Sequence, residues 1–317
     1  MLTAERALYR LLGWVLDEGE ALRILSAAHL LTLRLPVNRK GITNNLQRIS
    51  RHARQRDLAP DELEALFQEI AKLFTLLIID HFKGPESWPE LARAARLDFL
   101  PELDGLLARG RGALLVTPHF GNHPLFMYAL ACRGTRLDAV YNYGTSFRSL
   151  AERYPSLRLH DVGHAAAEIL KTLRDGGAVL TLCDVDYFPD NRTVEFFGAP
   201  YFPPHGPARL SLASGAPILP VYALLEDDAW RLVNDPPIDP AESDQAGIES
   251  HILRSMERRI AAKPGHWLQF RDAWDLAGNL AALREQLKAV HSNRMLSGLW
   301  EKVWGPFRPL RGPRRGP

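Results

Sequence analysis

The sequence has little cysteine and no long apolar run. Its 317 residues include two cysteines, Cys132 and Cys183, both in apolar stretches. No cluster with metal-ligand spacing surrounds either one, so we interpret both as buried free thiols. The longest charge-free run near the start, 24–33, has ten residues, whereas a spanning helix needs about 20. We therefore expect no transmembrane helix. No basic segment precedes an apolar core and a cleavage site, so we expect no signal peptide.

Two catalytic motifs and a strong charge bias are also missing. No G-x-S-x-G nucleophile elbow occurs, which argues against an α/β hydrolase. No G-x-x-x-x-G-K-[ST] phosphate loop occurs either. The formal net charge is +2, and the last thirteen residues hold four arginines and no acid. The rest of the chain is therefore close to neutral, which does not indicate nucleic-acid binding. The hydrophobic content of 46% is sufficient for a large core.

The first hundred residues have the periodicity of helices. Leucines and valines recur at helical spacing over 3–35, and a second apolar stripe covers 60–82. Asp61 and Glu62 stand near the positive end of the second helix. We predict an N-terminal helical region, 1–100, packed on the core. The alternative is that these helices lie on a membrane surface.

Strand and helix patterns alternate over 101–304, which we assign to an α/β core. The expected strands are 113–117, 137–141, 178–183, 217–225 and 230–234. The expected helices are 125–132, 165–173, 208–214, 250–262 and 280–290. This rhythm predicts a mixed, mostly parallel sheet with helices on both faces. A basic Pro/Gly tail, 305–317, follows.

His119 stands where a buried strand is expected to end and a helix to begin. Side chains at this point face the crevice in which α/β folds place their chemistry. A histidine there can take a proton from a substrate at neutral pH. The alternative is a buried histidine bonded to the backbone.

The stretch around His119 carries a resemblance. His119-Phe120-Gly121-Asn122 resembles the HFGNWE segment of the bacterial lipid A late (lauroyl and myristoyl) acyltransferases, in the lysophospholipid acyltransferase superfamily. Further blocks resemble that family in order: 182–187 (L-L-D-Q-D-Y), 194–198 (V-x-F-F-G), 206–210 with 214–220 (G-x-A-R-L, G-A-P-V-x-P) and 264–267 (P-E-Q-W). Residues 44–46 also echo an N-L element. The chain departs from the family at two positions. His123 stands where the family has Trp, and Pro124 stands where the H-x4-D/E motif has its acid.

The resemblance implies an acid beside the catalytic histidine, which Pro124 cannot supply. Asp184 and Asp186 end a neighbouring strand, and Glu195 lies in the next block. His123 would share a helical face with His119. We favour an acid from another strand and predict His119, Asp184 and Glu195 as catalytic.

Four further residues are predicted to bind substrate, and no residue is predicted to bind a metal. These residues are Asn122, His123, Asp186 and Arg209. Arg209 could bind a phosphate or carboxylate of the acceptor bidentately, or form a surface ion pair. Phe196 and Phe197 are expected in the core or in the wall of an acyl groove.

The resemblance implies an acyltransferase in which His119 is the general base. It would move a fatty acyl chain from an acyl-carrier-protein or CoA thioester to a hydroxyl or amine of a lipid or small molecule, with no other cofactor. The loss of the motif's acid suggests either an amide-forming relative or a non-catalytic protein that binds lipid or a partner. We expect a cytoplasmic protein, with its arginine-rich tail in peripheral contact with the inner face of the membrane.

Overall fold

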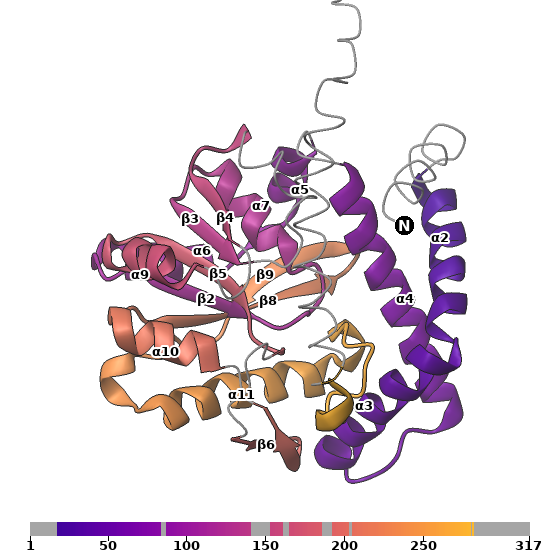
Figure 1. The fold of residues 1–317 in the computed structure, drawn as a ribbon. Coiled ribbons are helices and arrows are strands. Elements are labelled where there is room, and N and C mark those ends of the chain that lie inside the picture. Colours follow the sequence, from indigo (N-terminus) through magenta and orange to yellow (C-terminus); the bar gives the residue numbers. More distant parts are fainter. Residues whose placement is uncertain are drawn as a thin grey trace, which may run out of the picture. The chain divides into compact units, whose positions relative to one another are not determined.

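The computed structural model describes residues 18–83, 87–140, 153–160, 165–185, 192–202, 205–279 and 281. They confirm the expected fold class, a mixed and mostly parallel sheet between helices (Figure 1). The main sheet has the order β1-β9-β8-β2-β5-β3-β4. Strands β8 and β9 pair antiparallel, and the other neighbours pair parallel. The strands are β1 (Arg96–Leu97), β2 (Ala113–Thr117), β3 (Leu137–Val140), β4 (Leu157–His160), β5 (Ala178–Leu182), β8 (Ile218–Glu226) and β9 (Ala229–Asn234).

The central strand β2 is buried along its whole length. Successive side chains of a strand point to opposite faces. Leu114 and Val116 therefore join one apolar core, while Ala113 and Leu115 join another. The first core lies under α9 (Ala166–Arg174), α10 (His205–Ser214) and α11 (Gln245–Ala262). The second lies under α5 (Trp88–Ala94), α6 (Leu100–Ala108) and α7 (Pro124–Cys132).

Three N-terminal helices form a third core. They are α2 (Glu18–Leu33), α3 (Pro36–Arg54) and α4 (Pro60–Lys83). Their buried side chains include Leu33, Ile42 and Phe67, which cluster with Leu268 from the segment after α11. The chain divides into two units, Met1–Trp274 and Asp275–Pro317, and of the second unit the structure describes 275–279 and 281. The N-terminal helices and the sheet belong to the first unit. No helix of the described ranges has both the length and the apolarity needed to cross a membrane.

Most element boundaries agree with the sequence-based expectations. The five expected strands are present, with ends displaced by at most one residue. The expected helix at 280–290 lies outside the described residues, apart from residue 281, as does the tail. Cys132 and Cys183 are both free, but only Cys183 is buried and Cys132 is half-buried.

Several short or polar elements were not expected. Helix α3 has only a narrow apolar stripe, at Ile42, Leu46 and Ile49, within 19 mainly polar residues. The hairpin of β6 (Val194–Phe196) and β7 (Ala199–Tyr201) has strands too short to show a periodicity. Tyr201 of this hairpin contacts the candidate site described below.

Asn45 joins the N-terminal helices to the segment that follows α11. Its buried side-chain amide donates to the carbonyl oxygens of Gln269 (3.0 Å) and Arg271 (2.7 Å). Its Oδ1 accepts the N–H of Ala273 at 2.9 Å. One side chain therefore satisfies three backbone groups of a segment without regular structure.

We predict that Asn45→Ala lowers the free energy of unfolding by about 2–4 kcal/mol, because it removes three hydrogen bonds to backbone groups, two of them part-buried and one buried. Asn44→Ala is the matched control, since exposed Asn44 makes one hydrogen bond, to Asp272. The control should change stability by at most about 0.5 kcal/mol. Urea unfolding measures both, and equal effects of the two substitutions would contradict this role of Asn45.

Candidate active site

Two neighbouring parallel strands deliver the central residues of the site. Strands β2 and β5 pair in register, with Thr117 opposite Leu182. His119 and Asp184 each stand two residues beyond these paired ends. The Cys183 N–H donates to the carbonyl oxygen of Thr117 at 3.0 Å, so the register continues past the strands. His119 and Asp184 therefore meet at the carboxyl edge of the sheet.

The side chains of His119 and Asp184 form a hydrogen-bonded pair. His119 Nδ1 lies 2.8 Å from Asp184 Oδ1. Asp184 Oδ2 accepts two more donors at 2.9 Å, the backbone N–H of His119 and the indole N–H of Trp267. The Asp184 side chain is fully buried, whereas 32% of the His119 side chain is exposed. The carboxylate is thus held away from water while the imidazole reaches the surface.

Burial and pairing act in opposite directions on the pKa of each partner. Burial lowers the pKa of His119, but the charge of Asp184 and its hydrogen bond outweigh burial, so the pKa of His119 is raised. Burial raises the pKa of Asp184, but His119 and the N–H donors to the carboxylate outweigh it, so the pKa of Asp184 is lowered. Asp184 is therefore ionised at neutral pH. It orients the Nδ1–H of His119 and leaves Nε2 as the atom that can accept a proton.

The backbone around Gly121 holds His119 in this position. Gly121 has φ of +54°, and a Cβ there would lie 2.1 Å from the carbonyl oxygen of Ala223, so the turn requires glycine. The Gly121 N–H donates to the carbonyl oxygen of His266 at 2.8 Å. The Leu268 N–H donates to the carbonyl oxygen of His119 at 2.7 Å. Residues 266–268 thereby fix the turn from the other side.

Three residues near the pair were not assigned from the sequence. Trp267 binds the Asp184 carboxylate, and the Tyr201 hydroxyl donates to the carbonyl oxygen of Asp184 at 2.5 Å. Asp80 on α4 accepts the amide of Asn122 at 2.7 Å, and both are buried. Trp267 lies in the block 264–267 that resembles the family, so that resemblance could have pointed to it. No sequence motif pointed to Asp80 or Tyr201.

His123 cannot replace the missing acid. Its ring lies beside that of His119, with centroids 5.2 Å apart. Burial, followed by the proximity of His119, lowers its pKa to about 3. His123 is therefore neutral at physiological pH and carries no charge that could balance a protonated His119. Pro124 occupies the first turn of α7, where proline fits because no helical N–H is needed there.

The described contacts do not join Glu195 or Arg209 to the pair. Glu195 is exposed on β6, and among the described contacts none joins it to His119. Arg209 is an exposed residue of α10. Asp186 lies outside the described residues. The roles proposed for these three stay predictions. Of the candidate acids that the structure describes, Asp184 and Glu195, Asp184 is the one that contacts His119.

The geometry can hold and move a proton at His119 Nε2. Among the residues that the structure describes, no group of three or more His, Cys, Asp and Glu side chains could hold a metal ion. Fold and site thus define an α/β protein with a histidine–aspartate pair at the carboxyl edge of its sheet. The sequence model of the bacterial lipid A biosynthesis acyltransferases matches residues 27–275, and the chain belongs to this family.

The curated relatives include mycobacterial proteins. The chain is 29% identical over 200 residues to the phosphatidylinositol mannoside acyltransferase of Mycobacterium tuberculosis, which covers 60% of this chain and 63% of the relative. It is 28% identical over 187 residues to the protein of the same name from Mycolicibacterium smegmatis. This alignment covers 53% of this chain and 58% of the relative. The match spans less than two thirds of each relative. The lauroyl and myristoyl branch stays a prediction.

We predict that Asp184→Asn abolishes most activity by changing the tautomer of His119. The N–H groups of His119 and Trp267 both require an acceptor at the position of Oδ2. The new amide must then place its NH2 toward Nδ1 of His119, which moves the ring proton to Nε2 and removes the base. A loss of about 10⁴-fold in kcat is expected, by analogy with the same change in a serine protease triad.

The matched control for Asp184→Asn is Asp61→Asn, which neutralises an exposed carboxylate in the first turn of α4 and should leave kcat unchanged. In the wild type, kcat should rise with pH through a His119 pKa above 6.5, because only neutral His119 accepts a proton. Steady-state kinetics across pH 5–9 checks both statements. Activity that survives in folded Asp184→Asn would remove Asp184 from the mechanism.

Proposed function

We propose that the protein transfers a fatty acyl chain from an acyl-carrier-protein or CoA thioester to an acceptor, with His119 as general base and Asp184 as its charge partner. One observation carries this proposal: the partly exposed imidazole of His119 has its Nδ1 on a fully buried carboxylate. The family assignment supports acyl transfer as the reaction.

The reaction follows from the free Nε2 of His119. The acceptor oxygen attacks the thioester carbonyl carbon while its proton passes to Nε2. The tetrahedral intermediate then collapses, the carbon–sulfur bond breaks, and the proton on Nε2 passes to the departing thiolate. Asp184 offsets the positive charge that His119 carries between the two transfers. No redox partner is needed.

A hydroxyl acceptor fits the site better than an amine. The amine alternative arose because Pro124 replaces the motif's acid, so that base assistance looked weak. The Asp184 carboxylate supplies that assistance from β5, which removes the reason for preferring an amine. The names of the relatives point to mannosylated phosphatidylinositol as their acceptor. We propose a lipid hydroxyl, on a phosphate- or sugar-bearing headgroup, as the acceptor of this chain.

The non-catalytic alternative finds less support. A binding protein has no need for a buried carboxylate that orients a partly exposed imidazole. Burying a carboxylate costs several kcal/mol unless hydrogen bonds and a charge partner offset the loss of water. The presence of the buried Asp184 carboxylate beside His119 therefore favours catalysis over binding alone.

We further propose peripheral contact with an anionic membrane, because the acceptor is a lipid. The arginines of 305–317 would each contribute about 1 kcal/mol near such a surface. This segment lies outside the described residues. The exposed apolar side chains Ile24, Leu31 and Leu35 at α2 could add hydrophobic contact.

Incubation of the protein with a palmitoyl thioester of CoA or acyl carrier protein, together with phosphatidylinositol mannoside, should yield an acylated lipid by mass spectrometry. His119→Ala should lower turnover at least about 10²-fold, because a positioned base is lost. His251→Ala is the matched control: this exposed histidine of α11 should be dispensable. Full activity of folded His119→Ala would overturn the mechanism.

A further inference from the structure

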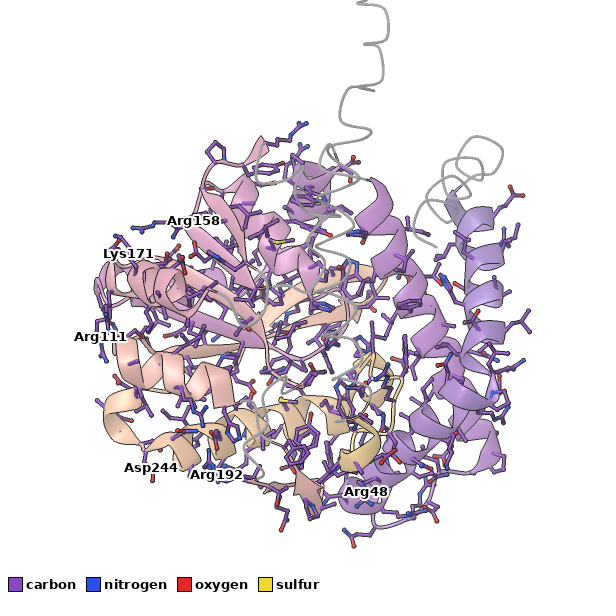
Figure 2. All side chains as sticks on the ribbon, viewed as in Figure 1. Arg48, Arg111, Arg158, Lys171, Arg192 and Asp244 are labelled. Atoms are coloured by element: carbon purple, nitrogen blue, oxygen red, sulfur yellow. The ribbon has the colours of Figure 1, made fainter. Side chains whose placement is uncertain are left out.

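A basic recess lies between α3 and the tip of the β6–β7 hairpin. Its volume is about 300 Å³. It is lined by Arg48, Arg51, His52, Gln55, Phe197 and Gly198. Figure 2 shows Arg48 on α3, at the lower edge of the view. No carboxylate is among the lining residues, so the recess presents mainly hydrogen-bond donors and positive charge.

Helix α3 is the source of this charge. Its 19 residues contain no aspartate or glutamate. Its basic side chains are Arg39, Lys40, Arg48, Arg51, His52 and Arg54. Because the rest of the chain is close to neutral, this accumulation on one helix is a local feature.

Arg48 is the residue that indicates an anion. Its side chain is half-buried, and its guanidinium lies 5.1 Å from the centre of the Trp274 ring. Among the described residues, no carboxylate pairs with it. A partly desolvated arginine without a counter-ion is unfavourable unless a ligand supplies the charge. The indole holds the guanidinium in place, so its N–H groups are ready for such a ligand.

Arg51 can join Arg48 at little cost. Arg51 pairs with Asp57 at 2.5 Å, but both side chains are about 60% exposed. An exposed pair of this kind contributes at most about 1 kcal/mol. A phosphate in the recess could therefore recruit Arg51 from Asp57. His52 stands beside them, with its ring 5.6 Å from that of Phe197.

The hairpin tip approaches His52 closely. Phe197 and Gly198 have φ of +48° and +69°, as a two-residue turn between paired Phe196 and Ala199 requires. A Cβ at Gly198 would lie 3.2 Å from His52 Nδ1. A bulky residue at positive φ costs about 1–3 kcal/mol, and such strain is often found at ligand sites. The nearby acid Glu257 accepts a hydrogen bond from the Phe197 N–H through its Oε1.

The recess adjoins the residues that support Asp184. Tyr201, at the base of the same hairpin, donates to the Asp184 carbonyl oxygen. Trp274, under Arg48, lies 6.0 Å from Trp267, whose indole N–H holds the Asp184 carboxylate. The recess and the catalytic pair therefore share one aromatic cluster.

We propose that this recess binds a phosphate group of a substrate, with Arg48 as its main ligand and Arg51 and His52 as further donors. This inference rests on the proposed function, which supplies two phosphate-bearing substrates. The phosphate belongs either to the CoA part of the donor or to the headgroup of a phospholipid acceptor. The planar guanidinium offers paired N–H groups, the arrangement that binds phosphate bidentately.

The test compares Arg48→Met with Arg39→Met. Methionine keeps an unbranched side chain over Trp274 but removes the charge. Arg39 is the matched control, because it lies on α3 near an aromatic ring, Phe67, at 5.8 Å, but does not line the recess. The offset of nine residues between the two, at 3.6 residues per turn, places them on opposite sides of the helix. Calorimetry measures binding of CoA and 3′-dephospho-CoA, and sedimentation measures binding to phosphatidylinositol vesicles.

We expect Arg48→Met to weaken binding of one phosphate source at least tenfold, with Arg39→Met like the wild type. Weaker binding of CoA identifies the donor, and dephospho-CoA then shows whether its 3′-phosphate is the group bound. Weaker vesicle binding with unchanged CoA binding identifies the headgroup. Equal behaviour of the two variants toward both probes, or a wild type that binds neither, overturns the proposal. These binding assays need no turnover. A negative result in them is therefore distinct from a wild-type protein that fails to transfer an acyl chain, which would contradict the proposed function. An unchanged melting temperature confirms that Arg48→Met is folded.

Discussion

The buried carboxylate of Asp184 accepts hydrogen bonds from three N–H groups. The first belongs to the His119 ring, the second to the His119 backbone and the third to Trp267. Without these donors, an ionised carboxylate at this depth would take up a proton. With them, it stays charged and fixes the tautomer of His119. Removing any donor would weaken the interaction that gives His119 its basicity.

In the proposed mechanism, the same carboxylate takes the place of the acid that the H-x4-D/E motif lacks at Pro124. In that motif the acid and histidine belong to one short segment. Here the acid comes from the adjacent parallel strand, and the in-register pairing of β2 and β5 brings it to the histidine. The distance between the two is therefore set by the register of the sheet. The aromatic cluster behind Asp184 extends this support to the basic recess beside α3.

The sequence predicts the long, strongly patterned elements well. Strand β2 is a continuous apolar run ending at the HFGN segment, and its position is confirmed to the residue. Asp184 was one of several candidate acids, since a sequence gives strand ends but not the register between strands. Helix α3 was missed because three buried apolar side chains in 19 residues make a weak pattern. Asp80 and Tyr201 approach the site only through tertiary packing, which no local spacing reveals.

The tautomer of His119 tests the central claim most directly. In protein labelled with ¹⁵N-histidine, the imidazole nitrogen shifts show which nitrogen carries the proton when the ring is neutral. The hydrogen bond to Asp184 predicts that Nδ1 is protonated and Nε2 is not, and that the ring titrates above 6.5. A neutral ring protonated at Nε2, or one that titrates below 6.5, would contradict the account, because Nε2 could then not accept the proton of the acceptor hydroxyl.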